Sequence, residues 1–364
     1  MFDRRLVMNF DVFLLVAVLA LSCLGVLNLK SICFSGGIQL SPYFYKQIYW
    51  IIISLFFLFI IININYASII RYSYYLHFLS LLLLLAVIFI GKMKYGSQRW
   101  IYLGPVSLQP SEIAKITFIL SLAKYYTENM TQKPFLIKDL IYPVFLLFST
   151  FLLIYLQPDL GTAGIVMLIF ISMTFFINIY KKSLVYILLF CFFSVPSFWF
   201  LLKDYQKNRI LTFFNPELDP LNAGYQIIQS KIAVGSGGLF GKGFNLGTQS
   251  QLRFLPEQHT DFVFSVWAEE WGFLGCFLIL FLFFFIIYRG LSISFDSRNI
   301  AGSFIAIGVS FLLFWQVIIN ILMTIGLFPV VGVPLPFFSY GGSSMLSCMI
   351  GVSLLLNIRM RKIM

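Results

Sequence analysis

The chain has 364 residues, of which 60% are hydrophobic, 19% aromatic and only 11% charged. Soluble domains carry about 25% charged residues, and a water-soluble protein of this length could not cover its surface with so few charges. The composition therefore excludes a cytosolic enzyme, a disordered protein and, despite a net charge of +11, a nucleic-acid binder. We expect a single polytopic, all-α integral membrane domain over residues 1–364.

A helix needs about 20 apolar residues to cross the bilayer core, and about ten stretches meet this requirement. They run approximately over 10–29, 44–62, 74–91, 111–126, 139–156, 160–178, 184–202, 262–288, 300–326 and 338–357. The fourth and fifth are the weakest candidates for membrane spans. The fourth carries the charged residues Glu112, Lys115 and Lys124, and the fifth contains Pro143. The first follows a basic pair, and Ala20-Leu21-Ser22-Cys23 loosely resembles a lipoprotein cleavage site. Because the apolar run continues to about Leu29 and no A-x-A site follows, we interpret it as a retained helix and not a signal peptide.

The distribution of lysine and arginine sets the orientation. With a cytoplasmic N-terminus, thirteen of these residues fall on the inner side and five in the short outer loops. An even number of helices also places the basic C-terminus inside, so we predict that both termini are cytoplasmic. The one long segment outside the membrane, about 203–261 between helices seven and eight, is then extracytoplasmic. We expect it to be ordered and to lie on the membrane surface.

Acidic residues gather on the opposite side from the basic ones. Nine of the fourteen lie in or beside predicted outer segments, so polar chemistry is expected on the outer face. Five cysteines without a CxxC pair and two histidines indicate no zinc or histidine-based metal centre. No internal repeat is visible, which weakens an inverted-repeat transporter as an interpretation.

Segment 96–115 is predicted to be an outer loop that enters the fourth helix at Ser111, whose hydroxyl can cap that helix. Glu112 and Lys115 are three residues apart and share a helical face. Opposite charges inside a membrane helix usually pair, so these two form either an ion pair that locks helices together or a polar site that faces a cavity. Arg99 and Trp100 are either interfacial anchors or part of the same site.

Two further outer segments carry candidate polar contacts. Asp159, in the tight turn 157–162, either caps the sixth helix or belongs to a site. The long outer segment supplies cations that can face a phosphorylated substrate, namely Lys203, Lys207, Arg209, Lys231, Lys242 and Arg253. Its glycine-rich run 235–247 either exposes backbone N–H groups to phosphate or simply forms turns, and it lacks the Ser or Thr of a P-loop.

Segment 254–272 holds the most reactive combination of residues. Thr260 is predicted to cap the eighth helix and Asp261 to open it, with Glu257 and His259 just before and Glu269 and Glu270 two turns deeper. A carboxylate at the lipid boundary beside a histidine fits a general base acting on an amphiphile, and a capping role is the alternative. Segment 326–345, with three prolines, is expected to be an irregular outer re-entry that walls a polar cavity.

Segments 96–115, 157–162, 222–238, 254–272 and 326–345, taken together and in order, resemble the SEDS family (shape, elongation, division and sporulation). The sequences GSQRW at 96–100 and PEQHTDFVFSVWAEEWG at 256–272 are more similar to the RodA branch of that family than to its FtsW branch. The resemblance implies a peptidoglycan glycosyltransferase of the bacterial cytoplasmic (inner) membrane, which polymerises lipid II during cell elongation. It also implies a class B penicillin-binding protein and the elongation machinery as partners.

The resemblance places the family's essential outer aspartate on Asp261, its QRW tryptophan on Trp100 and its Glu/Lys pair on Glu112 and Lys115. We hypothesise that Asp261 deprotonates the acceptor sugar and that undecaprenyl diphosphate leaves. No tightly bound cofactor is expected, although a divalent cation, Mg²⁺ or Mn²⁺, can stabilise the leaving group. The expected substrate contacts are Arg99, Trp100, Gln109, Ser111, Glu112, Lys115, Asp159, Arg209, Lys231, Lys242, Arg253, Glu257, His259, Ser339 and Tyr340.

Two other functions are compatible with a polytopic chain. A lipid II flippase fits the intramembrane Glu112 and Lys115, but the ionisable residues crowd one face and do not span the midplane. A non-catalytic scaffold that activates a penicillin-binding protein predicts that the outer polar residues can be replaced without loss of function.

Overall fold

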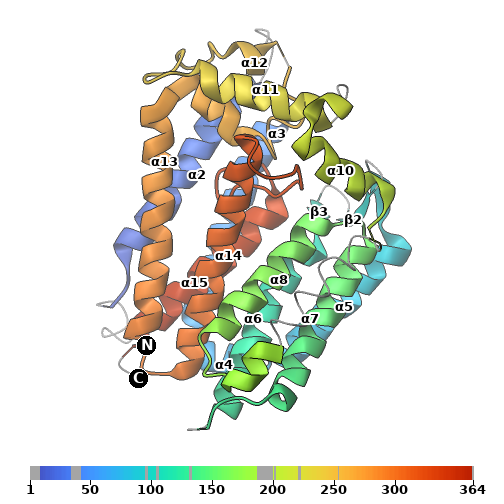
Figure 1. The fold of residues 1–364 in the computed structure, drawn as a ribbon. Coiled ribbons are helices and arrows are strands. Elements are labelled where there is room, and N and C mark those ends of the chain that lie inside the picture. The colour runs from blue at the N-terminus through green and yellow to red at the C-terminus, as the bar shows by residue number, and fades with distance from the viewer. Residues whose placement is uncertain are drawn as a thin grey trace.

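The computed structural model describes residues 9–33, 42–94, 97–103, 106–130, 133–186, 200, 202–219, 223–252 and 254–362. Its long helices lie side by side in one bundle, with α10, α11 and α12 across one end and α4 at the other (Figure 1). The helices are α2 (Val12–Cys33), α3 (Pro42–Asn63), α4 (Tyr66–Arg71), α5 (Ser73–Ile90), α6 (Pro110–Asn129), η1 (Ile137–Leu140), α7 (Ile141–Leu156), α8 (Leu160–Phe175), α10 (Asp204–Phe214), η2 (Pro216–Leu218), α11 (Ala223–Ser236), α12 (Thr248–Gln251), α13 (Val263–Asp296), α14 (Ile300–Thr324) and α15 (Gly342–Met360).

Seven of the described helical segments are long and apolar enough to cross a membrane, namely α2, α3, α5, Ile137–Leu156, α13, α14 and α15. Helix α6 is 20 residues long but carries three charged residues in its predicted span, and the apolar helix α8 has 16 residues. The predicted helical membrane class is therefore confirmed. Most of the predicted seventh span, 184–202, lies outside the described residues.

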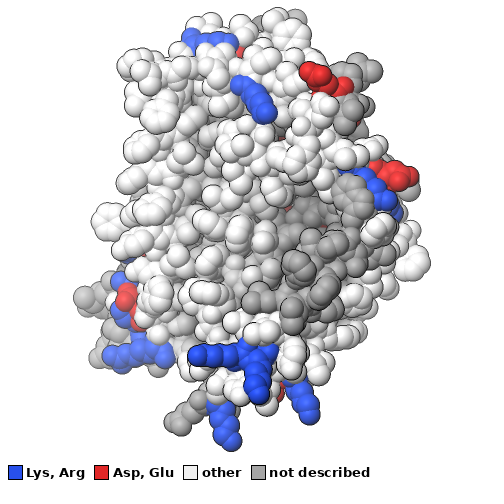
Figure 2. Space-filling view, viewed as in Figure 1, with Lys and Arg blue, Asp and Glu red and all other residues white. Residues whose placement is uncertain are grey.

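Charged side chains gather at the two ends of the bundle (Figure 2). Lysine and arginine dominate the end where α4 lies, whereas the described residues across the middle of this face are almost all uncharged. Large apolar side chains on the outside of the bundle, such as Phe78, Phe89 and Phe277, are more than half exposed. This arrangement is the one expected for a bundle whose middle is surrounded by lipid.

The predicted outer loop before α6 is instead a small antiparallel sheet. Its strands are β1 (Lys92–Lys94), β2 (Ser97–Leu103) and β3 (Val106–Leu108), in the order β1-β2-β3. Strand β2 packs against α5 and α6, so the sheet holds the ends of these helices together. The glycines and prolines of this segment indicated a loop, and β1 and β3, with three residues each, are too short to show an alternating pattern.

Helix α6 begins one residue earlier than predicted, and Ser111 does not cap it. Gln109 is the N-cap residue and Pro110 occupies the first helical position, where a proline is favourable because its missing N–H has no acceptor there in any case. Ser111 is buried in the first turn, and its hydroxyl has no hydrogen-bond partner among the described residues.

Helix α13 reverses its direction near its start. Asn28 donates a hydrogen bond to the carbonyl of Val263 (3.0 Å), and Ser31, one turn further along α2, donates to Glu270. Beyond this point the chain runs the other way, since Arg289 bonds to Asp11 at the beginning of α2. Residues 263–271 therefore run in the same sense as α2, and 273–296 run antiparallel to it.

This reversal corrects the predicted position of two carboxylates. Glu269 and Glu270 were expected two turns deeper in the membrane than Asp261, on the assumption of one straight helix. Because Glu270 contacts Ser31 near the C-terminal end of α2, whereas Val263 contacts Asn28, Glu270 lies nearer to the end of the bundle that α11 and α12 cover. The two carboxylates thus lie beyond Asp261, toward the end of the bundle that α11 and α12 cover.

The break in α13 is held by the glycine-rich run of the long segment. Gly272 has φ 62° and ψ −158°, a conformation essentially restricted to glycine. The amides of Lys242 and Gly243 donate to the carbonyls of Glu269 and Glu270, both at 3.0 Å, and the amide of Phe273 donates to Gly238 (2.9 Å). These amides are therefore occupied within the protein, and the turn alternative for residues 235–247 is the one observed.

We expect Gly272→Ala to destabilise the protein by about 3 kcal/mol, because it adds a methyl group to a backbone conformation that other residues avoid. The added Cβ would also stand 2.3 Å from the amide nitrogen of Gly241. Gly164→Ala is the matched control, since nothing lies within 4 Å of a Cβ at this helical position. It should raise stability by at most about 1 kcal/mol. Unfolding of both purified variants in detergent measures the difference, and equal stabilities would contradict a reversal at Gly272.

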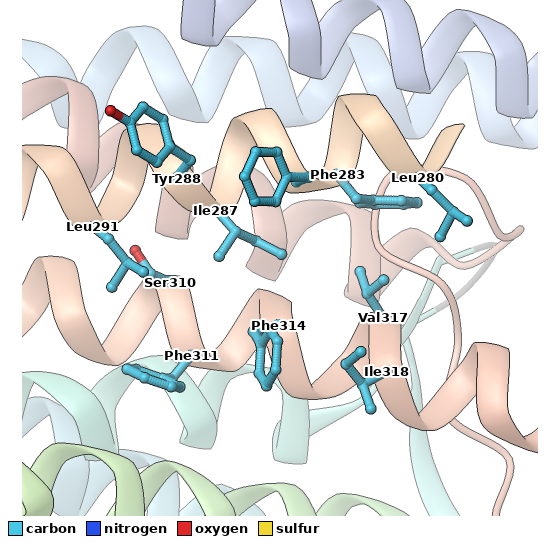
Figure 3. A pocket seen from close by; sticks show the side chains of 11 residues that line it. Leu280, Phe283, Ile287, Tyr288, Leu291, Ser310, Phe311, Phe314, Val317 and Ile318 are labelled. Atoms are coloured by element: carbon cyan, nitrogen blue, oxygen red, sulfur yellow. The ribbon is translucent and has the colours of Figure 1, made fainter. Parts of the chain in front are cut away.

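An apolar groove of about 360 Å³ lies between α13 and α14 (Figure 3). Phe283, Ile287 and Leu291 of α13 face Phe314 and Val317 of α14 across it. The side chains that line the groove are almost entirely hydrocarbon, as expected for a surface at membrane depth.

Candidate active site

Asp261 lies in a tight turn between α12 and α13, not in the first turn of a helix. The amides of Thr260 and Asp261 both donate to the carbonyl of Glu257, at 3.2 and 3.1 Å. Helix α13 begins only at Val263, with Phe262 as N-cap residue and no side-chain cap. The prediction that Thr260 caps this helix is therefore wrong, and so is the prediction that Asp261 opens it. The Thr260 hydroxyl instead donates to the Glu257 carbonyl (3.3 Å).

The turn that carries Asp261 is held by the irregular segment between α14 and α15. Ser339 donates through its hydroxyl to the carbonyl of Thr260 (2.6 Å), and the amide of Tyr340 donates to the carbonyl of His259 (2.9 Å). Residues 325–341 contain neither helix nor strand, as predicted for the re-entry before the last helix. The two loops are thus joined by hydrogen bonds directly beside Asp261.

The carboxylate of Asp261 is half-buried and stands above Gly332 of this second loop. A Cβ added at Gly332 would lie 3.3 Å from Asp261 Oδ2, so glycine leaves room for the carboxylate. Burial raises the pKa of Asp261 to about 6, and the nearby Glu257 adds to this effect. A hydrogen bond from Thr260 and the charges of Arg209 and Arg99 act in the opposite direction. The carboxylate is therefore ionised at neutral pH but more basic than an ordinary aspartate, which suits proton abstraction.

Arg99 reaches the site from strand β2 and ties it to the start of α8. Its guanidinium lies 3.5 Å from Asp159 and also donates to the carbonyl of Pro158. Asp159 is the N-cap residue of α8 and accepts hydrogen bonds from the amide (3.2 Å) and hydroxyl (2.9 Å) of Thr162. The capping alternative for Asp159 is thus observed. Gln109 also donates to this carboxylate, at 3.4 Å.

Arg209 approaches the same place from the long segment between α8 and α13. It extends from α10 and donates to the carbonyl of Val330 (3.0 Å), two residues before the glycine beneath Asp261. Helix α10 thereby contacts the second loop through a cation. Two arginines from distant parts of the sequence therefore flank one carboxylate, and a negatively charged group of a substrate can bind between them.

Aromatic rings form a further wall beside Asp261. The ring of His259 stacks on Tyr43 of α3, with centroids 4.9 Å apart, and Tyr340 packs edge-on against Tyr43 at 5.0 Å. His259 also lies 3.8 Å from the carboxylate of Glu257. Burial raises the pKa of Tyr340, so its phenol stays protonated and can act as a donor. His259, Ser339, Tyr340 and Glu257 are thus gathered around Asp261.

Other residues predicted to bind substrate lie elsewhere or are already paired. Lys242 contacts the buried Glu269 at 2.6 Å and Thr248 at 2.9 Å, so it closes the turn at the break in α13. Lys231 is exposed on α11 and packs over Gly326. Trp100 is half-buried on β2, opposite Lys92. Arg253 lies outside the described residues.

Glu112 and Lys115 form a buried ion pair inside α6. Their charged atoms are 2.8 Å apart, and the two side chains are 3% and 1% exposed. Ser347 of α15 donates to the second oxygen of Glu112 at 2.6 Å. Both charges are therefore neutralised within the protein, and the pair joins α6 to α15.

Comparison with known proteins places the chain in a family. The sequence model of the FtsW, RodA and SpoVE proteins, described as "Cell cycle protein", matches residues 10–363. The chain belongs to this family, the SEDS family. Because the described residues also include seven apolar helices of sufficient length, the chain is a multi-pass membrane protein.

Three relatives illustrate the range of this SEDS family. Peptidoglycan glycosyltransferase MrdB of Escherichia coli is 44% identical over 285 residues, which are 78% of this chain and 76% of that protein. Stage V sporulation protein E of Bacillus subtilis is 37% identical over 317 residues, which cover 86% of each chain. Peptidoglycan glycosyltransferase RodA of Treponema pallidum is 32% identical, with 99% of each chain covered.

Solved structures of SEDS proteins have the same fold. One is a chain from a structure described as "Structural coordination of polymerization and crosslinking by a peptidoglycan synthase complex". It matches with a TM-score of 0.81 and 32% identity over 97% of this chain and 98% of that chain. The crystal structure of Thermus thermophilus rod shape determining protein RodA matches with a TM-score of 0.73 and 28% identity, covering 98% of both chains.

Two residues that support this SEDS site were missed from the sequence. Asn320, fully buried in α14, donates to the carbonyls of Asp261 (3.0 Å) and Val333 (2.7 Å), and so bridges the two loops. Gln47 of α3 donates to the carbonyl of Ser339 (3.3 Å) and accepts from the amide of Gly341 (3.3 Å). A polar amide within an otherwise apolar membrane helix was the signal available for both.

The described residues do not form a ready-made metal site. Among them no group of three or more His, Cys, Asp or Glu side chains comes together in a way that could hold a metal ion. Asp261 and Glu257 offer two carboxylates, which is fewer than a protein-bound divalent cation usually requires. The expectation of Mg²⁺ or Mn²⁺ stays a prediction, and no step below depends on a metal.

The raised pKa of Asp261 leads to a prediction about pH. Activity that depends on the ionised carboxylate should fall as the pH decreases through about 6. Glu257→Gln removes the negative charge that raises this pKa, so the acid limb should move to lower pH. Arg209→Gln removes a charge that lowers it, so the limb should move to higher pH. The rate profiles of the parent and both variants test this, and shifts of the two limbs in the same direction would contradict it.

Proposed function

We propose that this protein is a peptidoglycan glycosyltransferase of the bacterial cytoplasmic membrane, which polymerises lipid II into glycan strands during cell elongation. The relatives named MrdB and RodA, both peptidoglycan glycosyltransferases, support the reaction. The single observation that carries the proposal is the environment of Asp261. This carboxylate has a pKa of about 6, lies on two interlocked loops and has two arginines nearby.

The proposed reaction is a displacement at a sugar carbon. Asp261 removes the proton from the 4-hydroxyl of the acceptor N-acetylglucosamine. The oxygen attacks C1 of the donor N-acetylmuramic acid, and the bond to undecaprenyl diphosphate breaks with inversion at C1. The charges of Arg99 and Arg209 reach Asp261, so these two cations would stabilise the negative charge that develops on the leaving group. Arg209 belongs to the set of outer cations predicted for this role, whereas Lys242 is held by Glu269.

The proposal includes a topology for the whole chain as one domain, residues 1–364. It has about ten membrane helices with both termini in the cytoplasm and an ordered extracytoplasmic segment at about 203–261. The gathering of lysine and arginine at the α4 end of the bundle supports the orientation, because basic residues are retained on the cytoplasmic side. Helices α10, α11 and α12, which fall within 203–261 and cross the opposite end, support the ordered outer segment.

The proposed partners are lipid II, undecaprenyl diphosphate, a class B penicillin-binding protein and the elongation machinery. Support for the penicillin-binding protein comes from the structural neighbour, which concerns a peptidoglycan synthase complex that couples polymerization to crosslinking. A glycan polymerase that works beside a transpeptidase can hand over each strand as it grows.

The decisive experiment is polymerisation of lipid II by the detergent-purified protein, with and without its penicillin-binding protein. In detergent no bilayer has to be crossed, so glycan strands can arise only from glycosyl transfer. We expect strands to form, and to form faster with the partner present. Absence of strands from both reactions, together with transfer of lipid II across vesicles, would favour a flippase instead.

A further inference from the structure

A second polar site lies at the end of the bundle opposite Asp261, where α4 meets the turn between α13 and α14 and the end of α15 (Figure 1). It is a cavity of about 520 Å³, lined by Asn65 and Tyr66 at the start of α4, by Arg298 and Asn299 before α14, and by Arg361 and Lys362 after α15. Three of these six side chains are cations, and nothing in the glycosyl-transfer site requires them.

Part of the positive charge that lines the cavity has no counter-ion among the residues that the structure describes. Arg361 is 8% exposed and donates only to neutral oxygens, among them the carbonyl of Ile62 (3.1 Å) and the side chain of Asn357 (2.6 Å). Within the part of the chain that the structure describes, no carboxylate lies within salt-bridge distance of Arg361 or Arg298. A buried cation without a counter-ion is costly, so an anion in this cavity would stabilise the folded protein.

The Asp296 carboxylate, which lies close to the cavity, is already shared. Asp296 pairs with Arg359 and lies 3.2 Å from Lys362. It therefore cannot also neutralise the two arginines of the cavity. Helix α14 begins beside them, and the amides of its first turn add partial positive charge at the same place.

The surroundings of the cavity indicate an amphiphilic anion. Ile300 lines the cavity and is 44% exposed, and Phe295 on the preceding turn of α13 is 79% exposed. Apolar side chains next to a cationic pocket at the end of a membrane bundle match the boundary between acyl chains and headgroups. Basic pockets between membrane helices commonly bind anionic lipid headgroups.

We propose that this cavity binds the phosphate headgroup of an anionic phospholipid from the leaflet at this end of the bundle. The phosphate contacts Arg361 and Arg298, and the acyl chains lie along Phe295 and Ile300. Because α4, the α13–α14 turn and the end of α15 all contribute, the lipid joins three parts of the chain that are distant in sequence. The proposal does not depend on glycosyl transfer.

The test is the thermal stability of delipidated protein in detergent, titrated with phosphatidylglycerol, with phosphatidylcholine of the same chains, or with inorganic phosphate. We expect phosphatidylglycerol to raise the melting temperature at concentrations at which phosphatidylcholine has no effect. Arg298→Gln, at an exposed position that does not endanger folding, should weaken the effect about fivefold, as expected for loss of one basic contact. Lys182→Gln, an exposed cation outside the cavity, is the control and should behave as the parent does.

Each alternative outcome overturns the proposal. Equal stabilisation by the two lipids would mean that the headgroup charge is not recognised. An unchanged titration for Arg298→Gln would place the lipid elsewhere on the protein. If inorganic phosphate stabilised the protein to the same extent as phosphatidylglycerol, the ligand would be a soluble phosphate compound and not the lipid.

Discussion

Asp261→Asn should reduce the rate of lipid II polymerisation by about 10²- to 10⁴-fold, the usual contribution of a positioned general base. The amide has the same shape as the carboxylate but cannot accept a proton at neutral pH. The surrounding contacts should survive, because the carbonyls of Thr260 and Asp261, and not the carboxylate, receive the bonds from Ser339 and Asn320. The measurement is glycan strand formation by purified protein at saturating lipid II.

Stability of the same variant separates catalysis from folding. Burial raises the pKa of Asp261, so the folded protein tolerates the ionised carboxylate less well than the unfolded chain does. At neutral pH a neutral amide should therefore leave the protein at least as stable as the parent. An Asp261→Asn protein that polymerises at nearly the parent rate would show that the base is another group. Loss of activity caused by unfolding would appear as a lower melting temperature.

The same variant distinguishes an enzyme from a scaffold. If the protein only activates a penicillin-binding protein, Asp261→Asn should still bind that partner and should leave strand synthesis by the complex unchanged. We expect binding to persist and synthesis to be lost. Strand synthesis must be measured on the complex with the penicillin-binding protein, because a scaffold would have an effect only in the presence of that partner.

The membrane helices could be predicted from the sequence because burial in lipid requires a minimum number of consecutive apolar residues. The predicted spans 44–62, 139–156 and 300–326 differ from Pro42–Asn63, Ile137–Leu156 and Ile300–Thr324 by at most two residues at either end. The exact ends of the helices were less predictable, because they depend on which residue caps or starts each helix. Ser111 was the more familiar capping residue, but Pro110 starts the helix because it needs no acceptor for its missing amide hydrogen.

The reversal of α13 could not be predicted, since an apolar run gives length but no direction. Gly272 was one glycine among many, and its φ of 62° becomes necessary only because residues 237–243 pack against the break. The long-range contacts of this run, such as the amide of Lys242 with the carbonyl of Glu269, have no signature in local sequence. The strands of the sheet were missed for a different reason, since β1 and β3 are too short to show an alternating pattern.

The candidate site was predictable in its residue types but not in its pairings. Asp261, Glu257 and His259 are adjacent in sequence, and the structure places them together. Lys242 and Arg209 were equivalent cations in the sequence, yet one is bound to Glu269 and the other approaches Asp261. Which cation faces which carboxylate depends on the tertiary fold, because every candidate partner lies far away along the chain.

Removing one partner of the Glu112–Lys115 pair should have the largest effect on stability. Lys115→Met leaves a carboxylate buried without a counter-ion, and Glu112→Gln leaves a buried ammonium group in the same position. Loss of one partner from a buried pair typically costs about 3–5 kcal/mol. Each single variant should therefore unfold more easily than the parent when purified in detergent, and glycan synthesis should fall with the amount of folded protein.

The double variant Glu112→Gln/Lys115→Met decides between the structural and the substrate-binding interpretations of the pair. Replacing both charges removes the uncompensated charge, so most of the lost stability should return. Because both side chains are almost fully buried and Ser347 satisfies the second oxygen of Glu112, neither group has an unsatisfied charge to offer a substrate. We therefore expect activity to return together with stability. A double variant that is stable but inactive would instead assign the pair a direct role in binding or transfer.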